Sequence, residues 1–166
     1  MKTEIINQLE NILTETTQLL DSFSQADINT VPFKDSWTAA QVGCHLLKSE
    51  TGIDGLFYTP TKKADRKPDE NIDELKKIFL DYSLKFKSPD FILPEDKIYD
   101  KEELIGSLKE VKTKITEAAK NVDLDEIAPL PQGHPFEGYT KLEMVHFLAY
   151  HTTRHNRQIQ NIKKMI

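Results

Sequence analysis

Four stretches of this chain place apolar residues three, four and seven positions apart, and this spacing constrains the fold more than any other feature. They cover residues 5–23, 38–57, 100–122 and 141–162. Such spacing puts the apolar side chains along one side of an α-helix, and twenty residues make a helix of roughly 30 Å. No segment shows the strict alternation typical of a strand. The pattern therefore predicts four long amphipathic helices.

Three of these helices begin at recognisable capping residues. Thr38 is followed three positions later by Gln41, and Thr140 is followed in the same way by Glu143, which is the spacing of a capping box. Asp100 precedes the third stretch and is a good N-cap residue. The second helix is expected to start at Thr38 and the last at about Lys141.

The connection between the second and third helices has a different character. Residues 58–71 are polar and charged, a short amphipathic piece covers 72–82, and two prolines exclude a regular helix in 87–97. Hydrophobic residues make up 38% of the chain and charged residues 30%, with only six glycines, as in helical globular proteins. We therefore predict an all-α fold: a four-helix bundle, residues 1–166 forming one domain, with a long irregular connection carrying a short extra helix.

Composition also limits the classes of partner. The formal net charge of −5 and the lack of a basic face interleaved with aromatics argue against nucleic-acid binding. We find no signal peptide and no apolar run long enough to span a membrane. The single cysteine, Cys44, excludes an internal disulfide and fits a reducing compartment, so we expect a cytoplasmic protein.

Three histidines lie on the inward stripes of two predicted helices. His151 and His155 are four residues apart, so their rings project ~40° apart from one helix face, and His45 lies in the apolar stripe of the second helix. Burying three imidazoles without partners is costly, and one divalent ion satisfies all three while leaving a coordination position open. The alternative is a hydrogen-bonded histidine cluster that only fixes helix packing.

The remaining histidines are less suited to a site. His134 lies in a loop rich in Pro and Gly, and His146 projects ~140° away from His151. The segment His151-Thr152-Thr153-Arg154-His155 lacks the glutamate of the H-E-x-x-H metalloproteases, so that chemistry is not implied.

The segments "WTAAQVGCHLLKSE" and "HPFEGYTKLEMVHFLAYHTTRHNRQIQNI" resemble the DinB-like (DinB/YfiT) superfamily of small metal-binding four-helix bundles. Family members carry a Trp that opens the second helix, a His eight residues later, and a late H-x-x-x-H-x-x-Q-I motif. The matching residues here are Trp37, His45, His151, His155, Gln158 and Ile159. Residues 58–100 match no part of the family pattern.

The resemblance implies a zinc or nickel ion held by His45, His151 and His155, and a small-molecule substrate. Characterised relatives include thiol S-transferases that use bacillithiol or similar low-molecular-weight thiols, and hydrolases. Relatives often form dimers, so a homodimer is compatible with the chain. The bound ion would activate a thiol or a water. The alternative is a non-catalytic bundle whose metal or histidine cluster is structural.

Several residues near the histidines are candidate helpers or neighbours. Ser49 either reaches the pocket or packs, Gln158 is placed to orient a ligand, and Arg154 is placed to pair with a substrate carboxylate or with solvent. Cys44 is expected to be a buried inert thiol, since its side chain points ~100° away from that of His45. Phe136 and Tyr139 are expected to line the pocket mouth or to close the bundle end.

Overall fold

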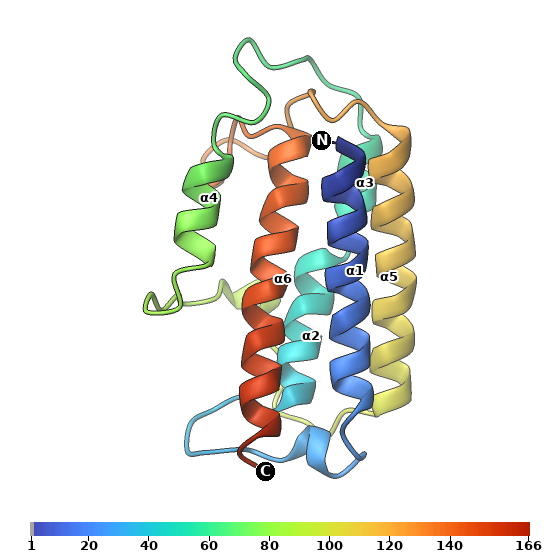
Figure 1. Cartoon of the computed structure of the whole chain (residues 1–166), viewed down its shortest axis with the longest axis vertical. Coiled ribbons are helices and arrows are strands. Elements are labelled where there is room, and N and C mark those ends of the chain that lie inside the picture. Colours follow the sequence, from blue (N-terminus) through green and yellow to red (C-terminus); the bar gives the residue numbers. More distant parts are fainter. Residues whose placement is uncertain (1) are drawn as a thin grey trace.

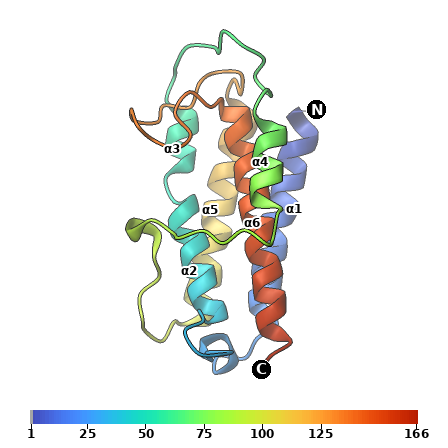
Figure 2. The same cartoon turned by 90° about the vertical axis from the view of Figure 1, so that its left-hand side faces the viewer.

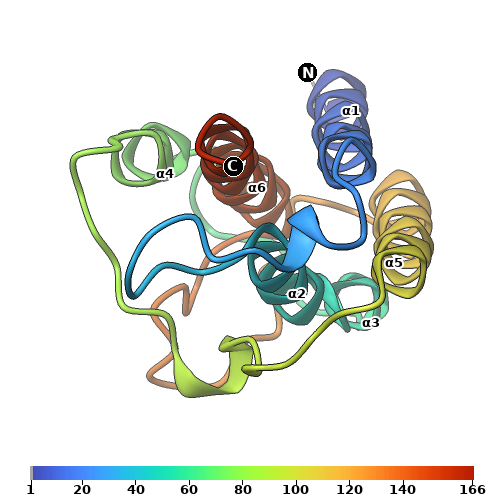
Figure 3. The same ribbon diagram turned by 90° about the horizontal axis from the view of Figure 1, so that it is seen from below.

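The computed structural model describes residues 2–166 and confirms the predicted helical bundle. Four long helices run roughly parallel to the long axis, and their most extensive mutual contacts follow the order α1, α5, α2, α6 around the bundle (Figures 1 and 3). They are α1 (Lys2–Asp21), α2 (Ala39–Glu50), α5 (Lys101–Asn121) and α6 (Lys141–Lys163). Short helices stand between them: η1 (Asp27–Asn29), α3 (Ile53–Tyr58), α4 (Ile72–Phe79) and η2 (Asp90–Ile92). None of the helices in residues 2–166 is long and apolar enough to cross a membrane.

The predicted capping residues start the helices that carry the histidines. The hydroxyl of Thr38 accepts from the backbone N–H of Gln41, whose side chain accepts in return from the backbone of Thr38. Thr140 and Glu143 form the same reciprocal pair at the start of α6. Asp100 caps α5 by accepting from the backbone N–H of Glu103. The capping boxes fix the start of both histidine-bearing helices.

The second helix ends earlier than its apolar pattern predicts. The pattern continues to Phe57, but α2 ends at Glu50 and the chain turns at Gly52, whose φ of 89° lies in the left-handed region that favours glycine. The short helix α3 then resumes, and Phe57 is still fully buried. Both α2 and α3 pack against α5. The apolar side chains therefore keep their period across the break.

The core has two apolar clusters separated by a polar layer. Along α1 one cluster uses residues 5–13 and the other begins at Leu20, while along α6 the clusters use residues 142–149 and 159–162. Between them lie, besides the ring of His151, the buried polar residues Thr16, Thr17, Glu50, Thr152 and Asn156. We call these five residues the middle layer. The hydroxyl of Thr16 donates to the side-chain carbonyl of Asn156 at 2.7 Å, which joins α1 to α6 within this layer.

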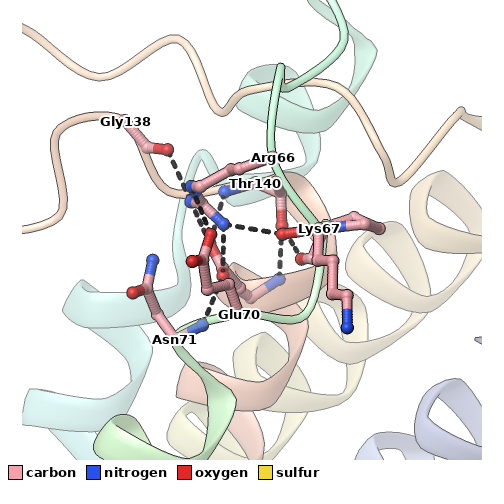
Figure 4. A network of polar contacts seen from close by, with 8 residues as sticks. Arg66, Lys67, Glu70, Asn71, Gly138 and Thr140 are labelled. Carbon is pink, nitrogen blue, oxygen red and sulfur yellow. Dashed lines mark hydrogen bonds and ion pairs between the residues drawn. The ribbon is translucent and has the colours of Figure 1, made fainter.

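The connection between α3 and α5 is held against the bundle by buried charge. Arg66 donates two hydrogen bonds to the fully buried carboxylate of Glu143, at 2.8 and 2.7 Å, and a third to the backbone carbonyl of Gly138 (Figure 4). The backbone N–H of Asn71 donates to the same carboxylate at 2.8 Å. These bonds hold the start of α4 against the first turn of α6.

Residues 80–95, which we call the strap, leave α4 and pass α6 to reach α2 (Figure 2). Arg154 on α6 donates to the backbone carbonyls of Phe79, Asp81 and Leu84. Lys48 on α2 donates to the carbonyl of Leu93 and pairs with the carboxylate at position 95. Two cations, one from each histidine-bearing helix, therefore hold the two ends of the strap.

Candidate metal centre

The three predicted histidines meet where α2 faces α6. His45 comes from α2, and His151 and His155 come from one face of α6. Each ring offers one nitrogen to a common point, and these three nitrogens lie within 4.8 Å of one another. No carboxylate or thiol in residues 2–166 joins this group. The cluster therefore offers three imidazole nitrogens and no charged ligand.

The spacing of the rings suits a small divalent cation. The Nε2 atoms of His45 and His151 are 3.3 Å apart. Tetrahedral bonds of ~2.0–2.1 Å from a metal to imidazole nitrogens place those nitrogens about 3.3–3.4 Å from each other. The pair already has the separation that tetrahedral coordination requires.

The outer nitrogens of two rings have partners that orient the inner nitrogens. The Nδ1 of His45 lies 3.0 Å from the backbone carbonyl of Ile92 in the strap, and that of His155 lies 2.9 Å from the side-chain oxygen of Gln158. Both oxygens accept, so Nδ1 carries the proton in each ring and Nε2 presents a lone pair. Sequence reasoning proposed Gln158 and missed Ile92, because a backbone carbonyl on an irregular segment has no sequence signal.

His151 differs from the other two rings. Its Nδ1 is buried and has no hydrogen-bond partner among the described residues. The ring stacks on Phe147 with centroids 5.3 Å apart and meets the ring of Phe79 at 6.1 Å. A buried polar atom without a partner costs roughly 1–3 kcal/mol and is unusual away from functional sites. The outer nitrogen of this ring therefore lacks the acceptor that orients the rings of His45 and His155.

Burial keeps the three rings in the form that binds metal. Loss of solvent lowers the pKa of His45, and it lowers that of His151 well below its usual value. The pKa of His155 falls to about 4, chiefly through burial and secondly through the neighbouring His45. All three imidazoles are therefore neutral at pH 7, and a neutral imidazole is the metal-binding form.

Aromatic rings surround the cluster. Trp37 lies with its ring centroid 5.3 Å from that of His45, on the side of α2 where the helix begins. Phe136 packs on Phe147 at 4.6 Å, and Phe147 in turn stacks on His151. Phe136 also contacts Tyr139, and both are partly buried against the apolar cluster at that end of the bundle. The predicted loop aromatics thus join the wall of the site through Phe147.

The three candidate helpers lie close to the cluster in different ways. The hydroxyl of Ser49 donates to the backbone carbonyl of His45 at 2.7 Å, within α2. Gln158 holds the outer nitrogen of His155. The guanidinium of Arg154 is occupied by strap carbonyls rather than by solvent, an arrangement that the helix pattern did not predict. Their catalytic roles stay predictions.

The other singled-out residues lie outside the histidine group. Cys44 is buried, with its sulfur 3.7 Å from a carboxylate oxygen of Glu95. His134 braces its own loop, because its Nδ1 accepts from the backbone N–H of Phe136. His146 pairs instead with the hydroxyl of Tyr150, at 3.2 Å. The cluster is therefore confined to three of the five histidines.

Comparisons with known proteins agree with this architecture. The model of a family described as the DinB superfamily matches residues 8–159. Uncharacterized protein YuaE of Bacillus subtilis (strain 168) is 25% identical over 156 residues, covering 92% of this chain and 93% of its own length. The structure of YfiT from Bacillus subtilis, described as a probable metal-dependent hydrolase with an unusual four-helix bundle topology, aligns with a TM-score of 0.63 at 16% identity. That alignment covers 98% of this chain and 86% of YfiT.

Proposed function

Because the chain belongs to the DinB superfamily, we propose that it is a metal-dependent enzyme acting on a small molecule, with His45, His151 and His155 as the ligands of a divalent ion, zinc or nickel. The observation that carries the proposal is the meeting of three neutral imidazole nitrogens within 4.8 Å. Three protein ligands leave one position open, as in catalytic zinc sites, whereas structural sites usually close with four.

The reaction class follows from what surrounds this position. When bound, such a cation lowers the pKa of a coordinated water or thiol and so supplies an anionic nucleophile near neutral pH. No carboxylate in the described chain stands among the ligands to serve as a general base. Activation of the nucleophile therefore falls to the metal centre.

The protein's own residues hold and enclose the site. Ile92 and Gln158 fix the rings of His45 and His155 in the tautomer that points Nε2 inward. Trp37, Phe79 and Phe147 line the cluster with apolar surface. Such a wall reduces water around the reacting atoms and strengthens electrostatic interactions within the site.

Two reactions use a nucleophile of this kind. Transfer of a low-molecular-weight thiol to an electrophile is the reaction that resemblance to the thiol S-transferases of the superfamily favours. Hydrolysis is the activity attributed to YfiT, which shares the fold. A screen separates them: turnover of an electrophile only when a thiol is supplied supports transfer, and turnover of an ester or amide without a thiol supports hydrolysis.

Metal analysis tests the shared premise. We expect about one equivalent of zinc or nickel in the purified protein and none in His45→Ala, whereas His146→Gln, which changes a histidine outside the cluster, retains it. Protein without stoichiometric metal, or His45→Ala with unchanged metal content, would falsify the proposal. A chelator that abolishes turnover but hardly changes Tm supports catalysis. A large fall in Tm without turnover on any substrate supports the structural alternative.

A further inference from the structure

Glu50 is a buried carboxyl group that the metal centre does not use. It is the last residue of α2, lies in the middle layer, and is 1% exposed. Its one hydrogen-bond partner among residues 2–166 is Thr152 of α6, whose hydroxyl donates to Oε1 at 3.1 Å. Besides the contact of His45 with His151, this is the side-chain hydrogen bond that joins α2 to α6.

No cation within residues 2–166 pairs with Glu50. The buried carboxylate of Glu143, in contrast, receives Arg66 and two backbone N–H groups. Burial raises the pKa of Glu50 to about 8, and the bond from Thr152 opposes this only in part. Glu50 is therefore a neutral carboxylic acid at pH 7, and it is the one carboxyl in the described chain whose pKa is raised in this way.

The ionisable groups on the surrounding helices do not act on Glu50. On α6, His151 and His155 are neutral. On α1, Glu15 is held by the side-chain amides of Asn156 and Gln160, and on α5, Lys112 donates to the hydroxyl of Thr14. Only burial and Thr152 shift the pKa of Glu50. A positive charge added in the middle of the bundle would therefore act on a carboxyl group that no other charge in the described chain balances.

The metal centre is where such a charge would enter. Glu50 follows His45 by five residues on α2, and its partner Thr152 directly follows His151 on α6. Five residues advance about 7.5 Å along a helix and turn ~140° around it, so the carboxyl lies on the order of 10 Å from the point where the three nitrogens meet. No hydrogen bond joins this carboxyl to a candidate ligand among residues 2–166.

We propose that Glu50 is the internal charge partner of the metal centre: it is a neutral acid in the metal-free protein and ionises when a divalent cation binds the three histidines. The O–H bond of the carboxyl breaks, its electron pair stays on the oxygen, and the proton leaves to solvent. This inference rests on the proposed metal site. Two positive charges about 10 Å away at an effective dielectric constant of about 20 raise the acid dissociation constant of the carboxyl roughly a hundredfold.

Ionisation of Glu50 would make metal affinity depend on pH in a defined way. By linkage, wild type binds the metal more tightly than Glu50→Gln only at pH values at which Glu50 of the metal-bound protein is ionised. A hundredfold change in acid dissociation constant makes Zn²⁺ bind several tens-fold more tightly to wild type than to the variant at pH 8, and less than twofold more tightly at pH 5.5. Gln retains an oxygen that accepts from Thr152, so the contact between α2 and α6 is preserved.

The test titrates Zn²⁺ alone into metal-free full-length protein against a chromophoric chelator at both pH values. Glu110→Gln, which removes an exposed carboxylate from α5, is the matched control and should bind as wild type does. Infrared difference spectra at pH 7 should show a protonated carboxyl band in metal-free wild type that disappears with Zn²⁺ and is missing in Glu50→Gln. Thr152→Val retains the carboxyl but removes the hydrogen bond that lowers the pKa of Glu50. The increase in Zn²⁺ affinity should therefore begin at a higher pH in this variant than in wild type.

The outcomes separate the two proposals. Zn²⁺ binding with equal affinity to wild type and Glu50→Gln at pH 8 leaves the metal centre intact and overturns the role of Glu50. A loss of affinity that is the same at pH 5.5 and pH 8, or a carboxyl band that survives Zn²⁺, shows a purely structural effect and also overturns it. Wild type that binds no Zn²⁺ overturns the metal centre and, with it, this inference.

Discussion

Replacing Arg66 by Met removes the cation that balances the buried carboxylate of Glu143. Glu143 is fully buried and keeps two backbone donors, from Asn71 and Thr140, while Arg66 is partly exposed. Breaking a buried ion pair by removing one partner costs about 3–5 kcal/mol. The remaining donors and the partial exposure of Arg66 point to the lower end, about 3 kcal/mol. For a chain of this size that corresponds to a fall in Tm of roughly 6–12 °C.

The effect of Arg66→Met should depend on pH with a definite sign. Burial alone would raise the pKa of Glu143, but hydrogen bonds from Arg66, Thr140 and Asn71 outweigh it and leave the pKa below its usual value. A depressed carboxyl pKa contributes stability above about pH 4.5, and this stability is lost as the pH falls through the folded-state pKa. The difference between wild type and variant should be largest near pH 7 and shrink below pH 4.5.

Urea unfolding followed by circular dichroism at pH 7 and pH 4 measures both effects. Arg66→Lys retains the charge but not the two-pronged contact, and we expect it to lose about half as much stability. Lys67→Met removes the neighbouring exposed cation and should change the free energy of unfolding by less than about 0.5 kcal/mol. A loss below about 1 kcal/mol in Arg66→Met, or an equal loss in Lys67→Met, would refute the reasoning.

Three further predictions concern the site and the core. Gln158→Leu should weaken zinc binding about 10–100-fold by freeing the ring of His155, whereas Gln160→Leu on the same helix should not; equal affinities would contradict the role of Gln158. In metal-free protein the raised pKa of Glu50 stabilises the fold below about pH 4.5, and this contribution, on the order of 5 kcal/mol, is lost as the pH rises through about 8. Glu50→Gln should therefore flatten the dependence of unfolding free energy on pH, and an unchanged slope in urea titrations would count against it. Gly43→Val should lower the unfolding free energy by about 2 kcal/mol, because even a Cβ at Gly43 would lie 2.9 Å from a methyl carbon of Leu20. Unaltered thermal stability would contradict this prediction and would show that the side chains of Leu20 and Leu104 move aside at little cost.

Local patterns were enough to predict the bundle. The period of apolar residues and the caps at Thr38, Asp100 and Thr140 act within one helical turn, so the sequence alone shows where α2, α5 and α6 begin. The break at Gly52 was missed, because the apolar period continues across it. An isolated glycine in a helical pattern is compatible with both a continuous helix and a turn.

The candidate ligands were recognisable for the same local reason. Two histidines four residues apart must share a helix face, and His45 lies in the apolar stripe of its own helix. The family pattern contains all three. The sequence by itself determined the helices, their inward faces and the three imidazoles. Only the tertiary structure decided that the Ile92 carbonyl holds His45, that Arg154 binds the strap, and that Glu50 is buried without a cation. These features depend on backbone carbonyls and on burial between segments tens of residues apart. Neither a backbone acceptor nor the burial of a single side chain produces a recognisable pattern in the sequence.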